Sequence, residues 1–183
     1  MKTAIIVIGF EGSGSVFISK TISHVISSTP FGDWNGYGFN RQMGEDGIVL
    51  HRSIPYMRPK LWHDDPAELR ELFAGYDRLR FVVTTRDLSA SVTSRMSRFG
   101  GTAEEYQNDN SRATRFLQKL LAQEDCFIWS YETMCALRKF YFDRLYAWLG
   151  VESSFVPNIE DANQRLFSRG FLETETGGPK DPS

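Results

Sequence analysis

The sequence predicts a three-layer α/β/α domain with a central parallel sheet. The apolar run "AIIVIG", residues 4–9, is rich in β-branched side chains, which is typical of a strand buried on both faces of a parallel sheet. Strand-like and amphipathic helix-like segments then alternate along the chain, a pattern that implies βαβ crossovers. The 183 residues suit one hydrophobic core. We therefore expect a single domain over residues 1–173 and a flexible tail over residues 174–183.

The first half of the chain gives four elements. Apolar residues at helical spacing predict a helix over residues 14–27. Residues 28–47 are dense in Gly, Asn and Asp, so we expect a long loop that forms a lid over a substrate or nucleotide. A strand over residues 47–55 ends in polar residues, and a helix over residues 64–76 begins with Asp65 as its N-cap.

The second half continues the alternation. The run "LRFVVTT" predicts a strand over residues 79–85, and a helix over residues 86–100 follows it and ends at two glycines. We expect a further helix over residues 110–123, a strand over residues 126–132 and one long helix over residues 133–150. Ligands of parallel α/β sheets bind beyond the carboxyl ends of the strands, so functional residues are sought directly after each strand.

Composition excludes several classes of protein. The net charge of −2 argues against a general nucleic-acid binder. No apolar run reaches the roughly 20 residues that span a bilayer, and the opening "MKTAIIVIGF" lacks a cleavage site, so a soluble cytoplasmic protein with no membrane partner is predicted. Cys126 and Cys135 do not form a metal-type pair, so we expect core thiols in a reducing compartment and no metal site.

The stretch "GFEGSGS", residues 9–15, predicts an anion-binding loop. Gly9 and Gly14 have the spacing of the phosphate-loop motif G-x-x-x-x-G-K-[ST], but Ser15 replaces its lysine. Glycines let successive backbone N–H groups point inward, the serines add hydroxyl donors, and the helix start adds its dipole. The alternative is a tight turn whose serines only cap the helix. The residues expected to bind the anion are Gly12, Ser13, Gly14, Ser15 and Val16.

A second anion contact is expected from the stretch "RDLSASVTS". Arg86 directly follows a predicted strand, and Ser94 lies about two helical turns further on. Together they would hold one phosphate, the guanidinium by a charged bidentate contact and the hydroxyl by a hydrogen bond. The alternatives are a surface salt bridge of Arg86 to Asp87 or Glu11, and an exposed helix position for Ser94.

In these motifs the chain resembles the sulfotransferases that use 3′-phosphoadenosine 5′-phosphosulfate (PAPS). The loop "GSGS", the stretch "RDLSASVTS", the strand end "IWSYETM" and the helix end "LYAWLGV" follow one another in the family's order. The resemblance implies a P-loop-type fold that transfers a sulfuryl group from PAPS to a hydroxyl or amine on a small molecule, glycan or peptide. The loop would hold the 5′-phosphosulfate, and Arg86 and Ser94 the 3′-phosphate. Tyr131 and Glu132 would support the fold.

The chain departs from the family pattern in three places. The cation that precedes the loop serine in the family would fall at Gly12. The family has a proline after the arginine and its acidic or amide neighbour, but no proline follows Arg86–Asp87 in this chain. The late R-K-G signature is reduced to "SRG", so Arg169 and Gly170 are candidates to complete the 3′-phosphate site.

Sulfuryl transfer needs a base for the acceptor proton and a cation near the leaving phosphate. The family base is a histidine after a strand, and His51 is the best match although Ser53 occupies the aligned position. The alternative for His51 is a half-buried structural residue. Arg52 is the first candidate for the cation. The further candidates for the cation are Arg41 and Lys20, and the reserve base is His63 beside Asp64 and Asp65.

Two other classes stay open. A P-loop phosphotransferase is disfavoured by the missing lysine and by the lack of a clear Mg²⁺-binding aspartate at a strand end. A sulfotransferase-like protein that binds a nucleotide without turnover is favoured if Gly12 removes an essential charge. The sequence identifies neither the acceptor nor the oligomeric state. Aromatic loop residues that would line an acceptor pocket are Trp34, Tyr37, Phe39 and Tyr56.

Overall fold

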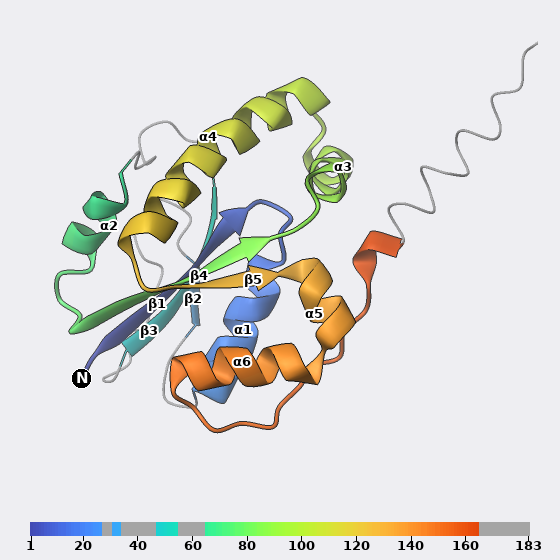
Figure 1. The fold of residues 1–183 in the computed structure, drawn as a ribbon. Helices are drawn as coiled ribbons and strands as arrows, with labels where there is room; N and C mark the ends of the chain where they lie inside the picture. The colour runs from blue at the N-terminus through green and yellow to red at the C-terminus, as the bar shows by residue number, and fades with distance from the viewer. Residues whose placement is uncertain (27–30, 34–46, 55–64, 165–183) are drawn as a thin grey trace, which may run out of the picture.

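A computed structural model describes residues 1–26, 31–33, 47–54 and 65–164 of the chain. These residues form a five-stranded, all-parallel sheet in the order β2-β3-β1-β4-β5, with helices on both faces. The three-layer α/β fold expected from the sequence is confirmed (Figure 1). The elements are β1 (Thr3–Phe10), α1 (Ser15–Val25), β2 (Phe31–Asp33), β3 (Gly47–Ile54), α2 (Pro66–Leu72), β4 (Arg78–Thr85), α3 (Leu88–Phe99), α4 (Ala103–Gln123), β5 (Cys126–Ser130), α5 (Tyr131–Leu137) and α6 (Lys139–Leu149).

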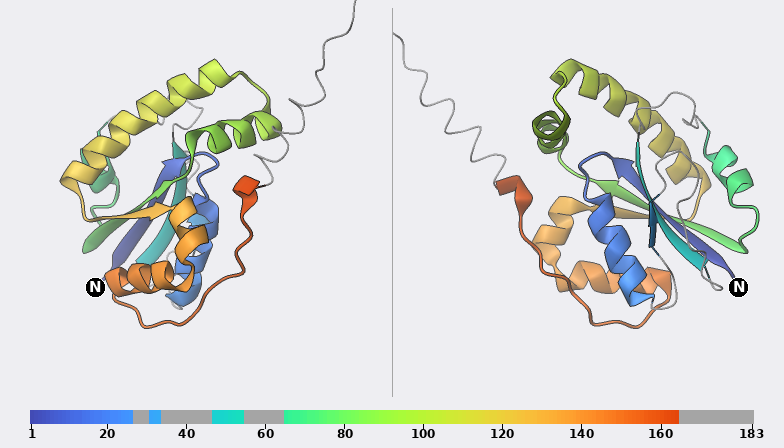
Figure 2. Two further views of the ribbon diagram at one scale, coloured as in Figure 1. Left: turned by 45° about the vertical axis from the view of Figure 1, so that its right-hand side comes forward. Right: turned by 180° about the vertical axis from the view of Figure 1, so that it is seen from behind.

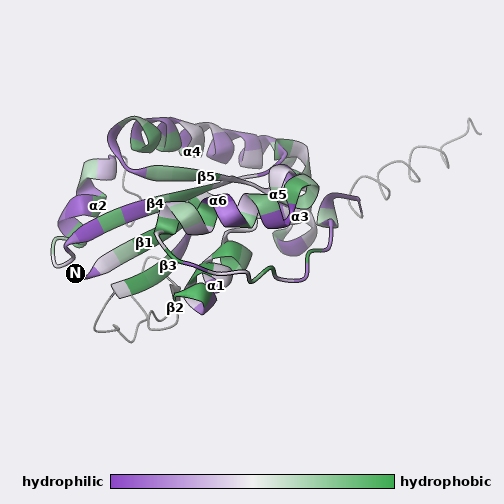
Figure 3. Ribbon diagram, turned by 60° about the horizontal axis from the view of Figure 1, so that its bottom comes forward, coloured by the Kyte–Doolittle hydropathy of each residue, from purple (hydrophilic) through white to green (hydrophobic). Residues whose placement is uncertain are grey.

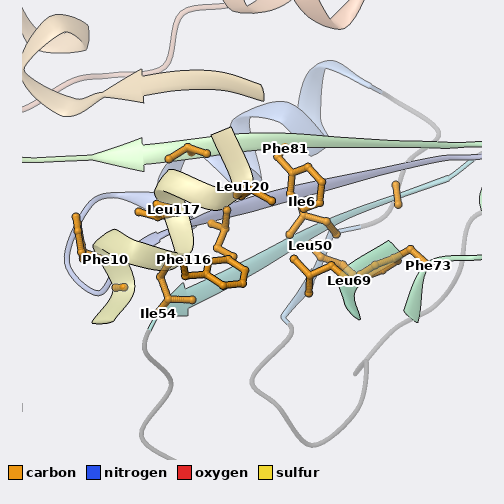
Figure 4. Close-up of a cluster of buried hydrophobic side chains, with 14 of the residues drawn as sticks. Ile6, Phe10, Leu50, Ile54, Leu69, Phe73, Phe81, Phe116, Leu117 and Leu120 are labelled. Carbon is orange, nitrogen blue, oxygen red and sulfur yellow. The ribbon is translucent and has the colours of Figure 1, made fainter. Parts of the chain in front are cut away.

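The central strand β1 separates two hydrophobic cores, one on each face of the sheet. Its side chains alternate, so that Ile6 and Ile8 enter one core while Ile5 and Val7 enter the other. The first core lies under α2 and α4 and contains Leu69, Phe73, Phe116, Leu117 and Leu120 (Figure 4). The second lies under α1 and α6, which cover the opposite face in both views of Figure 2. Burial on both faces explains why β1 is apolar throughout.

The parallel register brings the carboxyl ends of the strands to one edge of the sheet. Phe10 at the end of β1 pairs with Ile54 at the end of β3, and Gly9 pairs with Thr84 near the end of β4. The carboxyl ends of β1, β3 and β4 therefore lie side by side. This edge is where the sequence placed the functional residues.

Helix α4 begins earlier than the sequence pattern indicated, at Ala103 rather than at residue 110. Its start is fixed by a capping box, in which Thr102 Oγ1 accepts from the Glu105 N–H and Glu105 Oε2 accepts from the Thr102 N–H. Polar and apolar residues alternate along its length in Figure 3, as expected of a helix with one face on the core. Another difference is that Phe31–Asp33, expected in a loop, pairs as β2 beside β3.

The prediction of one long helix over residues 133–150 is wrong, because the chain forms two helices joined at Arg138. This residue has φ 46° and ψ −120°, a conformation that side-chain-bearing residues adopt at a cost. Its N–H still donates to the Met134 carbonyl (2.9 Å), and its own carbonyl accepts from Tyr141 (3.0 Å). The turn sends α6 back under the sheet, where Phe142 and Leu145 complete the second core.

Both cysteines pack against the cores, as expected. Cys126 lies beside the first core and Cys135 beside the second. Burial, assisted by Glu124 and Asp125, raises the pKa of the Cys126 thiol to about 12, so this sulfur stays protonated at neutral pH. Within the described part of the chain, no helix has the length and apolarity that crossing a bilayer requires.

The strain at Arg138 leads to a stability prediction. We expect Arg138→Gly to raise the free energy of unfolding by about 1 kcal/mol, because glycine adopts this backbone conformation without a Cβ penalty. Arg144→Gly is the matched control in the exposed middle of α6, where the same exchange should lower stability by about 1 kcal/mol. Urea denaturation of the two variants measures both. Equal destabilisation by both would contradict a strained Arg138.

Candidate active site

The amino end of α1 is left without a side-chain cap. Its N-cap is Gly14 at φ 88°, and the first N–H to donate along the helix is that of Ile18, to the Gly14 carbonyl (3.2 Å). By contrast α2, α3, α4 and α5 each have a capping side chain, from Asp65, Asp87, Thr102 and Ser130. The earlier N–H groups of α1 are thus available to an anion, with the helix dipole behind them.

The loop before α1 is shaped by a close approach between β1 and β4. A Cβ on Gly9 would overlap both the hydroxyl and the carbonyl oxygen of Thr84. The Thr84 hydroxyl also bonds Ser13 Oγ (2.7 Å), and the Ser13 N–H donates to the Phe10 carbonyl (3.0 Å). The side chain of Ser13 is fully buried and committed to the loop, so the expectation that its hydroxyl binds the anion is corrected.

One pocket of about 560 Å³ gathers both anion-binding motifs. Gly12, Gly14, Ser15 and Val16 line it from the loop and the start of α1, and Ser94 lines it from α3. The remaining lining residues are Glu11, Phe17, Lys20, His51, Ser53, Arg86 and Arg98. The predicted anion-binding stretches, residues 9–15 and 86–94, therefore face one cavity although 71 positions separate Ser15 from Arg86.

Arg86 is held in place by three contacts. Its Nη1 donates to the Gly12 carbonyl (2.9 Å), its Nε donates to Asn163 Oδ1 (2.7 Å), and its guanidinium lies 4.6 Å from the centre of the Tyr131 ring. The Nη2 atom is buried and has no hydrogen-bond partner among the described residues. The alternative of a salt bridge to Glu11 is not found, because Glu11 pairs with Arg95. Arg86 thus lines the pocket with its guanidinium held in one orientation.

Two residues directly after β5 support this arrangement, as the family resemblance implied for them. Glu132 Oε1 accepts from the Asp87 N–H (2.9 Å) and from Asn163 Nδ2 (2.9 Å). The Tyr131 hydroxyl accepts from the Ala162 N–H (2.8 Å), and burial raises its pKa. Asn163 was not predicted from the sequence, because no motif marks a residue whose role is to contact Arg86, 77 positions earlier in the chain.

The strand alternation in β3 separates the two residues proposed for the chemistry. His51 and Ser53 both line the pocket, and His51 Nε2 lies 3.3 Å from Ser53 Oγ. Arg52, between them, points to the other face, buried between Leu50 and Ile54 of the first core. The prediction that Arg52 supplies a cation to this pocket is therefore corrected.

Lys20, a further candidate for the cation, lies on α1 and lines the same pocket as His51. Arg98, one turn after Ser94 on α3, also lines the pocket and was missed because no family motif includes it. The proposed positions that lie outside the described residues are Arg169, Gly170, Arg41, His63, Trp34, Tyr37, Phe39, Tyr56 and the tail over residues 174–183.

A buried arginine ties the loop to α4. Arg95 is 1% exposed, its Nε lies 3.7 Å from Glu11, and its Nη2 donates to Asp109 (3.0 Å). Its guanidinium stacks 3.9 Å from the centre of the Tyr106 ring. The loop, α3 and α4 therefore share one charged network, which the sequence pattern did not reveal.

Comparison with solved structures finds the same fold in a sulfotransferase. The chain matches the crystal structure of mouse sulfotransferase SULT7A1 complexed with PAP, with a TM-score of 0.56 and 9% sequence identity. The match covers 97% of this chain and 68% of that one. No family model and no curated protein matches the sequence. At this identity the likeness shows the fold that the chain shares with that sulfotransferase.

The close approach at Gly9 leads to a second prediction. We expect Gly9→Ala to lower the free energy of unfolding by about 1–3 kcal/mol, because the added methyl group must displace Thr84 or the strand that carries it. Gly75→Ala is the control, since a Cβ there meets nothing within 4 Å. Thermal and urea unfolding of both variants measure the difference. A Gly9→Ala protein as stable as the control would contradict the contact.

Proposed function

We propose that the protein is a sulfotransferase that moves a sulfuryl group from PAPS to a hydroxyl or amine acceptor. The observation that carries the proposal is that Arg86 and the uncapped start of α1 line one pocket. Two separate anion-binding features in one cavity fit a ligand with two phosphate groups. The structural neighbour was crystallised with PAP, which supports the same ligand class here.

The two phosphate groups would occupy different ends of the pocket. The N–H groups of Ser15 and Val16 would hold the 5′-phosphosulfate, where the helix dipole favours negative charge. Arg86 and Ser94 would hold the 3′-phosphate between a guanidinium and a hydroxyl. Asn163 and Gly12 fix the guanidinium before the ligand arrives, so little rotamer freedom is lost on binding.

His51 and Lys20 would carry the chemistry. PAPS supplies the activated sulfuryl group. The acceptor oxygen or nitrogen forms a bond to sulfur as the bond from sulfur to the 5′-phosphate oxygen breaks, and His51 takes the acceptor's proton. Ser53, 3.3 Å from the His51 ring, would orient that base. The Lys20 ammonium would neutralise charge that develops on the leaving phosphate.

The backbone at Gly12 supports a cation that comes from elsewhere. Gly12 has φ 84°, so any side chain there would be strained, although a Cβ would find its nearest neighbour, the Ser91 carbonyl oxygen, at 3.5 Å. A lysine or arginine at this position thus conflicts with this loop conformation, not with the available space. The same glycine favours the second candidate function, binding of the nucleotide without turnover.

A calorimetric titration with adenosine 3′,5′-bisphosphate tests the binding half of the proposal. We expect wild-type protein to bind it, and Arg86→Ala to bind about 10–100 times more weakly, because a charged hydrogen-bonded contact contributes about 1.5–3 kcal/mol. Arg144→Ala, an exposed arginine on α6, is the charge-matched control and should leave the affinity unchanged. A preference for ATP with Mg²⁺ over the bisphosphate would overturn the proposal in favour of a phosphotransferase.

Turnover assays test the catalytic half. With PAPS and a panel of phenols, amines and amino sugars, we expect Lys20→Ala and His51→Ala each to lower the rate at least 100-fold, the size of one general-base or charge-stabilising contribution. His51→Ala should bind the bisphosphate within threefold of wild type. Lys139→Ala, which loses an exposed lysine on α6, serves as the control. Tight bisphosphate binding with no acceptor sulfated by wild type would favour the non-catalytic function.

A further inference from the structure

A second cleft lies on the opposite side of α3 from the nucleotide pocket. It has a volume of about 600 Å³ and is walled by α3 and α4, which lie next to each other in Figure 2. Val92 and Met96 line it from α3. At 100° per residue, each is about half a turn around the helix from Ser94, which faces the other pocket. The two cavities therefore share α3 as a wall but do not share lining residues.

The side chains that line this cleft are uncharged. None of its ten lining residues, all in the described part of the chain, carries a charge, whereas the nucleotide pocket contains Lys20, Arg86, Arg98 and Glu11. Leu88 and Met96 are 51% and 39% exposed where they line it. Such a surface offers no charged side chain to a nucleotide or another anion and favours a neutral ligand.

One lining residue of the cleft carries a buried polar atom without a partner among the described residues. Asn110 on α4 is 5% exposed, and its Oδ1 is buried with no hydrogen-bond partner among the described residues. The hydroxyls nearby are already used, since Ser111 donates to the Gln107 carbonyl (2.9 Å) and Thr114 to the Asn110 carbonyl (2.8 Å). A buried amide without a partner lowers stability, so its presence here is explained if a ligand completes it.

We propose that the α3–α4 cleft binds a small neutral molecule with an apolar ring or chain and a terminal amide that pairs with Asn110. The ligand's N–H donates to Asn110 Oδ1, and its apolar part lies against Val92, Met96 and Leu88. A carboxylate of the same shape is rejected, because it has no proton to donate and would lose its hydration without gaining a cation. This site does not depend on the proposed sulfotransferase activity.

An NMR titration of the full-length protein with benzamide tests the proposal. Benzamide has one ring and one primary amide, benzoate has the same shape with a charge, and acetophenone has the carbonyl without the N–H. We expect benzamide to bind with a Kd in the millimolar range, as is usual for a probe of this size, and to shift signals from α3 and α4. Benzoate and acetophenone should bind about tenfold more weakly or not at all.

Variants assign the binding to Asn110. Asn110→Leu removes the amide at similar volume and should weaken benzamide about tenfold while the protein stays folded, because an apolar side chain suits the buried position better than an unpaired amide. Asn110→Ser is a second variant that also removes the amide. Ser94→Ala, on the other face of α3, should leave benzamide binding unchanged. Absence of benzamide binding, or wild-type affinity in both Asn110 variants, would overturn the proposal.

Discussion

The close approach of Gly9 to Thr84 is the contact on which the rest of the site depends. At this point β1 and β4 come so near that a side chain on Gly9 has no room, and the Thr84 hydroxyl instead bonds Ser13. That bond curls the loop and sets where α1 begins. Thr84 also lies two residues before Arg86, so the same contact fixes the start of α1 and Arg86 relative to each other. The geometry of the pocket is therefore a consequence of strand packing.

Arg86 joins three parts of the chain that are distant in sequence. It contacts the loop through the Gly12 carbonyl, the start of α5 through the Tyr131 ring, and the segment after α6 through Asn163. Glu132 closes the arrangement by accepting from both Asn163 and the backbone of Asp87. A guanidinium held on several sides keeps one orientation beside the pocket. The supporting residues thus act on the ligand through the orientation of one side chain.

The sequence predicted those features that depend on local pattern. Strands buried on both faces contain runs of consecutive apolar residues, so β1, β3 and β4 were found, and Arg86 and Ser94 were found from their positions after β4. Features that depend on contacts across the chain were missed, among them Asn163 and the Arg95 network. Some local signals were overlooked: Thr102 and Glu105 form a capping box three residues apart, and strand alternation alone separates Arg52 from His51. The break at Arg138 had no such signal, because arginine rarely adopts its conformation.

Helix α3 has a cavity on each side and carries Arg95, which reaches both Glu11 in the loop and Asp109 on α4. A packed helix moves as a unit, so a change in its position alters both cavities at once. A ligand that moves α3 when it fills one cavity would therefore change the free energy of filling the other, and thermodynamic linkage would make the two effects equal in size.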